Sequence, residues 1–153
     1  MTLFIRVYDA PQPGGSKKGF VNPKTGRVII LEDAKRNKPW RQSVKAAALD
    51  AIAKASAWSM PDGSVKLTIT FYMLRPKGHY GTGRNAGMLK QTAPRFPTTK
   101  PDLTKLVRST EDALTGIVWH DDAQIVTQVL FKRYADEDSP VGAEMWIETA
   151  PTR

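Results

Sequence analysis

The fold of this chain is decided by the stretch VKLTITFYM, residues 65–73. Apolar side chains occupy every second position from Val65 to Met73, and a period of two is typical of a strand with one buried face. Upstream, small apolar residues recur at helical spacing from Trp40 to Ala57, behind a proline placed for a first helical turn. A helix followed by such a strand predicts a sheet with a helical layer packed on it.

Further elements are predicted on both sides of this centre. A second helix is expected from Asp102 to Thr115, and Gly116 is placed to end it. Short apolar or alternating runs predict the other strands, which are Leu3 to Tyr8, Phe20 to Asn22, Arg27 to Leu31, Ile125 to Phe131 and Glu144 to Thr149. The order β-β-β-α-β-loop-α-β-β predicts a single two-layer α+β domain over residues 1–153.

Composition excludes several kinds of site. The 153 residues include no cysteine and two histidines, which excludes disulfide frameworks, thiolate zinc sites, iron–sulfur clusters, a cysteine nucleophile and a multi-histidine metal site. No apolar run approaches the roughly 20 residues that span a bilayer, and the first residues lack the apolar core of a signal peptide. We therefore expect a soluble, cytoplasmic protein with no membrane partner and no organic cofactor.

Charge is unevenly distributed along the chain. The formal net charge is +8 and the sequence pI is about 9.8. Residues 1–60 and residues 61–110 each carry a net charge of +7, whereas residues 111–153 carry −6. A basic bulk with an acidic last part predicts a polyanionic partner and a local carboxylate cluster. The alternative is a basic soluble protein with scattered surface charge.

Residues 75–101 form a long segment without periodicity, which we call the basic arm. It contains six lysines and arginines and no acid, and its glycines and prolines argue against regular structure. A loop of this length in a compact domain is usually functional or mobile. We interpret it as a flexible arm that follows phosphates, in which Tyr80 and Phe96 either stack on bases or pin the loop to the core.

Acidic residues in three short segments are candidates for metal chemistry. Magnesium takes one or two carboxylates together with water and substrate phosphate, so Asp102 and Asp122 would suffice if the fold brought them together. Structural alternatives stay open: Asp102 is placed as a helix N-cap, and Asp121 and Asp122 as a polar turn. Residues 111 and 112 lie too far along the expected helix to share an ion with Asp102, and salt bridges are expected for both.

Two residues beside the last acidic segment also have alternative interpretations. His120 is a candidate general base or metal ligand, but a lone histidine beside acids is more often a surface residue or a hydrogen-bond partner. Trp119 stands where an apolar run meets the acids, and it is most simply a core anchor for this turn.

Three blocks of the sequence resemble the signature of RusA-type Holliday-junction resolvases. They are KPDLTKLVR at residues 100–108, DALTG at residues 112–116 and WHDDAQI at residues 119–125. The family signature runs Lys-Pro-Asp-x-Asp-Asn-Leu-x-Lys, then Asp-Ala-Leu-x-Gly, then Asp-Asp-x-Gln-Ile. The turn GSKK at residues 15–18 is similar to the family's early basic turn. This variant of the signature resembles members from bacteriophages and prophages.

The resemblance implies a RusA-like homodimer with a mixed sheet and two main helices, acting in a bacterial host cell. It implies a crossover junction endodeoxyribonuclease of DNA recombination and repair, which cuts two opposed strands of a four-way junction with Mg²⁺ or Mn²⁺. Matched position by position, Asp102 and Asp122 are the catalytic, metal-binding aspartates, and Asp121 is an auxiliary metal position. Arg108 takes the place of a catalytic lysine.

The sequence departs from the family signature at two positions. Thr104 occupies the place of the second catalytic aspartate, so the site loses a full negative charge. Lys105 replaces the usual asparagine and adds a positive charge beside the site. The alternative to a resolving endonuclease is therefore a junction-binding protein with impaired catalysis. A third hypothesis is a structural protein in which the carboxylates only cap and bridge.

Recognition of DNA is expected to depend on backbone charge and junction shape, because no base-reading motif is apparent. The expected phosphate contacts lie in the early basic turn, in the basic arm and at the start of the second helix. Besides Arg108, they are Lys17, Lys18, Arg75, Lys77, Arg95, Lys100 and Lys105.

Overall fold

The stretch at residues 65–73 forms β4 (Val65–Met73), as predicted, and β4 has a partner strand on each side. In the computed structural model, which describes residues 1–15, 18–31 and 37–149, β4 pairs parallel with β5 (Ile125–Tyr134) and antiparallel with β6 (Gly142–Thr149). Strand β1 (Thr2–Val7) pairs antiparallel with β6 and completes the order β1-β6-β4-β5. This mixed sheet confirms the predicted α+β class.

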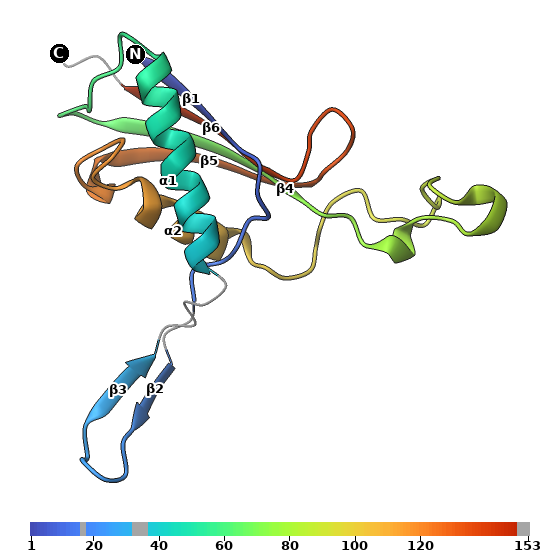
Figure 1. Cartoon of the computed structure of the whole chain (residues 1–153), viewed down its shortest axis with the longest axis horizontal. Helices are drawn as coiled ribbons and strands as arrows, with labels where there is room; N and C mark the ends of the chain where they lie inside the picture. Colours follow the sequence, from blue (N-terminus) through green and yellow to red (C-terminus); the bar gives the residue numbers. More distant parts are fainter. Residues whose placement is uncertain (16–17, 32–36, 150–153) are drawn as a thin grey trace.

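Two helices, α1 (Asn37–Lys54) and α2 (Leu103–Leu114), lie across the same side of this sheet (Figure 1). Their apolar sides and the inward side chains of the strands form one core, in which Trp40 and Trp119 are the largest buried side chains. The apolar face predicted for the first helix is confirmed, and the second helix buries an apolar face as well. Buried members of the core include Val44, Ala48, Leu67, Ile69, Phe71, Leu106, Val107, Ala113, Leu114 and Ile147.

The opposite face of the sheet carries exposed aromatic side chains. Phe4 of β1 and Trp146 of β6 lie with their ring centroids 4.5 Å apart, and Trp146 is 46% exposed. Phe131 of β5 is exposed as well. Only one face of the sheet is thus covered by the two helices, as expected for a two-layer domain.

Strands β2 (Lys18–Val21) and β3 (Val28–Leu31) form an antiparallel hairpin. The sequence predicted both strands, but they form a separate two-stranded sheet and do not join the main one. In Figure 1 the hairpin extends away from the helices and the four-stranded sheet.

The basic arm also projects from the body, beyond the end of β4 (Figure 1). The sequence predicted no regular structure in this arm. The structure differs, because the arm contains the short 3₁₀ helices Lys77–His79 and Gly83–Asn85 and a bridge between Tyr80 and Leu89. Phe96 is 51% exposed, so the interpretation that it pins the loop to the core is wrong. None of the described helices is long and apolar enough to cross a membrane.

Candidate active site

Helix α2 has two faces with different roles. Four residues at positions i, i+4, i+7 and i+11 share one line along the helix, and we call them the polar stripe: Thr104, Arg108, Glu111 and Thr115. Thr104 and Arg108 are exposed and Glu111 is half-buried. The stripe begins at Thr104, where the resemblance implied an aspartate, and ends at Thr115, the C-cap of the helix.

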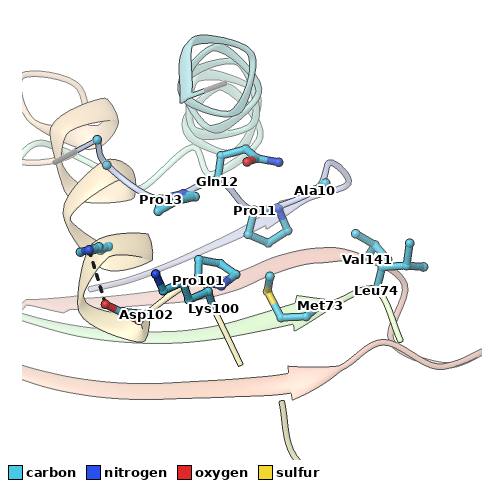
Figure 2. Close-up of a pocket in the computed structure, with 13 residues that line it drawn as sticks. Ala10, Pro11, Gln12, Pro13, Met73, Leu74, Lys100, Pro101, Asp102 and Val141 are labelled. Atoms are coloured by element: carbon cyan, nitrogen blue, oxygen red, sulfur yellow. Dashed lines mark ion pairs between the residues drawn. The ribbon is translucent and has the colours of Figure 1, made fainter. Parts of the chain in front are cut away.

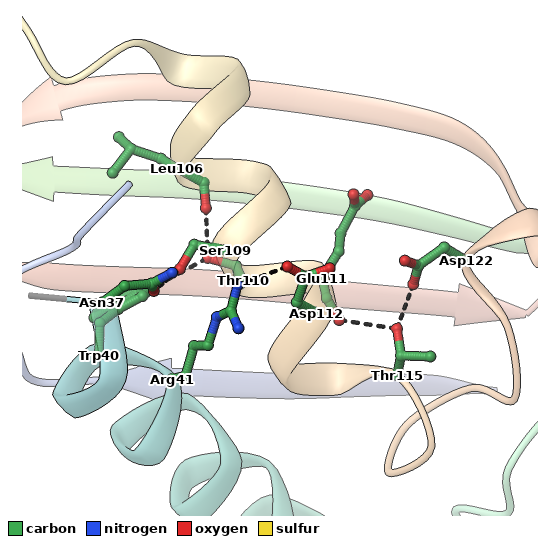
Figure 3. Close-up of polar contacts among 10 residues, drawn as sticks. All are labelled: Asn37, Trp40, Arg41, Leu106, Ser109, Thr110, Glu111, Asp112, Thr115 and Asp122. Atoms are coloured by element: carbon green, nitrogen blue, oxygen red, sulfur yellow. Dashed lines mark hydrogen bonds and ion pairs between the residues drawn. The ribbon is translucent and has the colours of Figure 1, made fainter. Parts of the chain in front are cut away.

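The other polar residues of α2 bind the helix to α1. Trp40 Nε1 donates to Thr110 Oγ1 at 3.2 Å, and Ser109 is hydrogen bonded to Asn37. Asp112 forms an ion pair with Arg41, with the nearest atoms 2.7 Å apart, which confirms the salt bridge expected for Asp112. These contacts fix the rotation of α2 about its axis, so the polar stripe faces away from α1 (Figure 3).

The chain turns back after α2 and returns Asp122 to the end of the polar stripe. Gly116 adopts φ +78°, a left-handed conformation that glycine takes without strain, and its N–H donates to the Trp119 carbonyl at 2.7 Å. Trp119 is fully buried, which confirms its role as a core anchor. Its Nε1 donates to Asp122 Oδ1 at 2.9 Å, and the Thr115 hydroxyl donates to the same oxygen (Figure 3).

Glu111 lies beside Asp122 and has an unusual electrostatic environment (Figure 3). Burial, followed by the nearby carboxylates of Asp122 and Asp112, raises the pKa of Glu111 to about 7, against a lowering effect of Arg108. Gln128 of β5 donates a hydrogen bond to Glu111 Oε1. The salt bridge expected for Glu111 is therefore not found among the described residues. Its partners are the side-chain amide of Gln128 and the nearby carboxylate of Asp122.

Asp121 has a structural role in the turn that follows Trp119. It caps the 3₁₀ helix Asp122–Gln124, since its Oδ1 accepts from the Ala123 N–H at 2.8 Å. The Gln124 side chain accepts in return from the backbone N–H of Asp121 at 3.1 Å. His120 is exposed, and its Nε2 lies 3.5 Å from Asp62 Oδ1, which agrees with a surface position.

Asp102 lies at the opposite end of α2, at the N-cap position. Within the described residues its side chain makes no capping hydrogen bond. Asp102 is thus the N-cap residue by position, but its carboxylate does not cap the helix. The carboxylate is 54% exposed and its Oδ2 lies 3.5 Å from Lys105 Nζ. Lys132 of β5 fixes the preceding segment by donating to the carbonyls of Thr99 and Pro101, both at 2.9 Å.

A pocket of about 570 Å³ opens beside Asp102. Figure 2 shows the loop of Pro11, Gln12 and Pro13 facing Lys100 and Asp102 across it. The loop is held against α2, since the Gly14 N–H donates to the Lys105 carbonyl at 2.8 Å. Asp102 therefore lines a hollow with two lysines, away from Asp122.

The structure does not bring Asp102 and Asp122 together. Asp102 precedes the first residue of α2 and Asp122 is bonded to Thr115, just after its last residue, and a helix of 12 residues is about 18 Å long. The expectation that these two aspartates share one ion is not met in this conformation, because the helix between them acts as a spacer. Among the described residues, no three His, Cys, Asp or Glu side chains are grouped to hold a metal ion.

The expected phosphate contacts differ in their surroundings. Lys17 lies outside the described residues, and Lys18 begins β2. Arg75 is used at the base of the basic arm, where it donates to the Pro94 carbonyl at 2.9 Å and lies over the Tyr134 ring at 4.0 Å. Lys105 is paired with Asp102, whereas three further cations are exposed: Lys77, Arg95 and Lys100.

The family model described as "Endodeoxyribonuclease RusA" matches residues 11–145. The chain belongs to the RusA endodeoxyribonuclease family. It is also similar to "Uncharacterized protein YqaN" of Bacillus subtilis (strain 168), with 28% identity over 131 residues, which cover 86% of this chain and 87% of the relative. Membership of the RusA family supports nuclease activity and Holliday-junction resolution in general, and it confirms the resemblance identified in the sequence.

The family also gives a reason to test the site for divalent cations, since RusA-type nucleases generally depend on them. Carboxylate oxygens are the ligands that Mg²⁺ and Mn²⁺ prefer. Asp122 and Glu111 provide two such groups at one end of the polar stripe, next to an exposed arginine. The donor set at this end therefore fits a hard divalent cation.

The raised pKa of Glu111 predicts a pH-dependent stability in metal-free buffer. Between pH 4.5 and about 7 the folded chain retains the Glu111 proton and the unfolded chain releases it, so the free energy of unfolding falls as pH rises through this window. Allowing for partial exposure, we expect a loss of about 1–2 kcal/mol. Urea unfolding in EDTA measures it, and Glu111→Gln should lack this component. Equal pH profiles for both chains would contradict the prediction.

Proposed function

We propose that this RusA-family chain is a structure-selective endonuclease that resolves four-way DNA junctions by divalent-metal-dependent hydrolysis of phosphodiesters. The observation that carries the proposal is the family match over residues 11–145. The arrangement around α2 supports it, because the signature blocks fold into one helix and the turn that returns along its polar stripe. The proposed setting is the cytoplasm of a bacterial host cell, with a bacteriophage or prophage source.

Asp122 is the proposed metal ligand with the best-defined position. Thr115 and Trp119 both donate to its Oδ1, and within the described residues its Oδ2 accepts no hydrogen bond, which leaves that oxygen for a cation. Asp121 is proposed as an auxiliary ligand, and Asp102 as a catalytic carboxylate at the other end of the helix. When bound, a divalent cation supplies Lewis acidity that favours attack of water on the phosphodiester and offsets developing charge.

Positive side chains along the same surface are proposed to position the DNA backbone. Arg108 projects from the polar stripe between Thr104 and Glu111, and its planar guanidinium suits paired contacts to phosphate oxygens. The basic arm, in which most lysines and arginines are exposed, projects beyond the body (Figure 1), and we propose that it extends the contact with DNA. The phosphate contacts named from the sequence remain part of this proposal.

Paired symmetric cuts require two active sites related by a two-fold axis, so we propose a homodimer as the working form. The uncovered face of the sheet supports this proposal. Its exposed aromatic residues Phe4 and Trp146 lie beside the ion pair of Lys66 with Glu148, at 2.8 Å. Such a face suits a protein partner better than DNA.

Thr104 favours one alternative, a junction-binding protein that no longer cuts. We expect the wild-type chain to cut a labelled four-way junction on two opposed strands in Mn²⁺, and Thr104→Asp to change the rate by less than about tenfold. The reason is that Thr104 is exposed and lies two helical turns before Glu111, so it is distant from the carboxylates at the end of the stripe. A linear duplex of equal length is the control for structure selectivity. Cutting that appears only in the Thr104→Asp chain would instead establish the binding-only alternative.

A further inference from the structure

We propose that Glu111 is a second metal-binding carboxylate of this site, and that with Asp122 it replaces the carboxylate that Thr104 does not provide. This inference rests on the proposed metal-dependent nuclease function. It assigns a role to a residue that the family signature, as matched on this sequence, leaves without one, and it moves the metal site from the start of α2 toward its end.

The first support is the position of Glu111 on the helix. Glu111 follows Thr104 by seven residues, two turns along the same polar stripe, with Arg108 between them. A displacement of two turns is about 10 Å along the axis, and it is toward Asp122. Asp102, by contrast, is separated from Asp122 by the length of α2.

The second support is the way in which each carboxylate is held. Asp122 is anchored through Oδ1 by Thr115 and Trp119, and Glu111 is anchored through Oε1 by Gln128. Within the described parts of the chain, neither Asp122 Oδ2 nor Glu111 Oε2 accepts a hydrogen bond. Each carboxylate is thus held through one oxygen atom, and its second oxygen atom is available to a ligand. Protein carboxylates that bind a hard cation are commonly held in this way.

The third support is a contrast with the neighbouring acid on the same helix. Asp112 lies next to Glu111 in sequence but is neutralised by Arg41 at 2.7 Å. Glu111 is half-buried and forms no ion pair among the described residues, and the charge of Asp122 acts on it more strongly than that of Arg108. A divalent cation held between Glu111 and Asp122 would offset the repulsion between their negative charges.

Binding of Mn²⁺ to the full chain, followed by electron paramagnetic resonance of the free ion, tests the inference. We expect Glu111→Gln to weaken Mn²⁺ binding by at least about tenfold, comparable with the effect of Asp122→Asn. Asp112→Asn is the matched control, since it removes the same charge from the adjacent residue, and we expect its affinity to stay within about twofold of wild type. Wild-type affinity in Glu111→Gln would overturn the inference.

A second measurement uses the wild-type chain and does not depend on how a variant folds. Paramagnetic Mn²⁺ should broaden the NMR signals of the Gln128 side-chain amide and the Trp119 indole at low metal ratios. The Trp146 indole, on the far face of the sheet, should stay sharp. Broadening centred on Lys100 and Lys105 beside Asp102, with Gln128 unchanged, would overturn the inference.

The two proposals fail in different ways. If the wild-type chain cuts a junction in Mn²⁺ while Glu111→Gln retains full affinity and full activity, the endonuclease proposal stands and the role of Glu111 is wrong. If the wild-type chain neither binds Mn²⁺ nor cuts, both the proposed function and the inference that rests on it are wrong.

Discussion

Asp122→Asn is expected to lower Mn²⁺-supported cleavage of a four-way junction by more than about 100-fold. The substitution removes the negative charge but retains an oxygen that can accept from Thr115 and Trp119, so the turn at the end of α2 keeps its anchor. Affinity for the junction in metal-free buffer should change little, because the basic arm and Arg108 are untouched. The variant therefore separates chemistry from DNA binding.

Single-turnover cleavage of a labelled junction at saturating enzyme measures this effect. Asp62→Asn is a suitable control, because Asp62 is a fully exposed acid paired with His120 and has no proposed role in the site. Asp102→Asn, assayed in parallel, tests the carboxylate at the other end of the helix. Manganese-dependent cutting that persists in both aspartate variants would show that the site has been placed wrongly.

The second large effect concerns salt. If six to ten phosphates are contacted, raising monovalent salt from about 50 to 200 mM should weaken junction binding by roughly 10³–10⁵-fold. The reason is release of counterions from the DNA when exposed lysines and arginines replace them. The basic arm has no acid to oppose this effect, and residues 1–110 carry nearly all of the positive charge.

Fluorescence anisotropy of a labelled junction in EDTA, over a range of salt concentrations, gives the slope. Replacing Lys77 and Arg95 together by alanine should reduce the slope by about two, since each contacted phosphate contributes about 0.9. Lys54→Ala is a control, because Lys54 pairs with Asp50 within α1, away from the surfaces proposed to contact DNA or a second copy. A slope near zero for the wild-type chain would refute recognition through the DNA backbone.

The elements of the fold were predictable because their signals are local. Alternation over residues 65–73 and helical spacing around Leu106 and Leu114 report which side of each element is buried, and burial in the structure follows both patterns. Strand partners were not predictable in the same way. The residues of β2 and β3 have ordinary strand signals. Those signals do not indicate that the two strands pair with each other in a separate sheet and leave the main sheet to four other strands.

The candidate site was only partly predictable, for a geometric reason. The signature identified Asp102 and Asp122, but whether they meet depends on where the chain returns after α2, and Gly116 and Trp119 set that turn. The sequence predicts a salt bridge for Glu111 because this residue is too far along the helix to share an ion with Asp102. Its spacing of seven from Thr104 was the available signal, whereas its contact with Gln128 comes from tertiary structure.

One side chain connects folding to chemistry in this molecule. The six-membered ring and the nitrogen of the Trp119 indole belong to one rigid body, which fills the interior and at the same time aims Asp122 through a single N–H. A rigid body cannot loosen in one capacity and stay fixed in the other. We therefore expect warming that loosens the packing around this ring to shift the N–H that holds Asp122 at the same time, so that core packing and the orientation of this carboxylate are lost together.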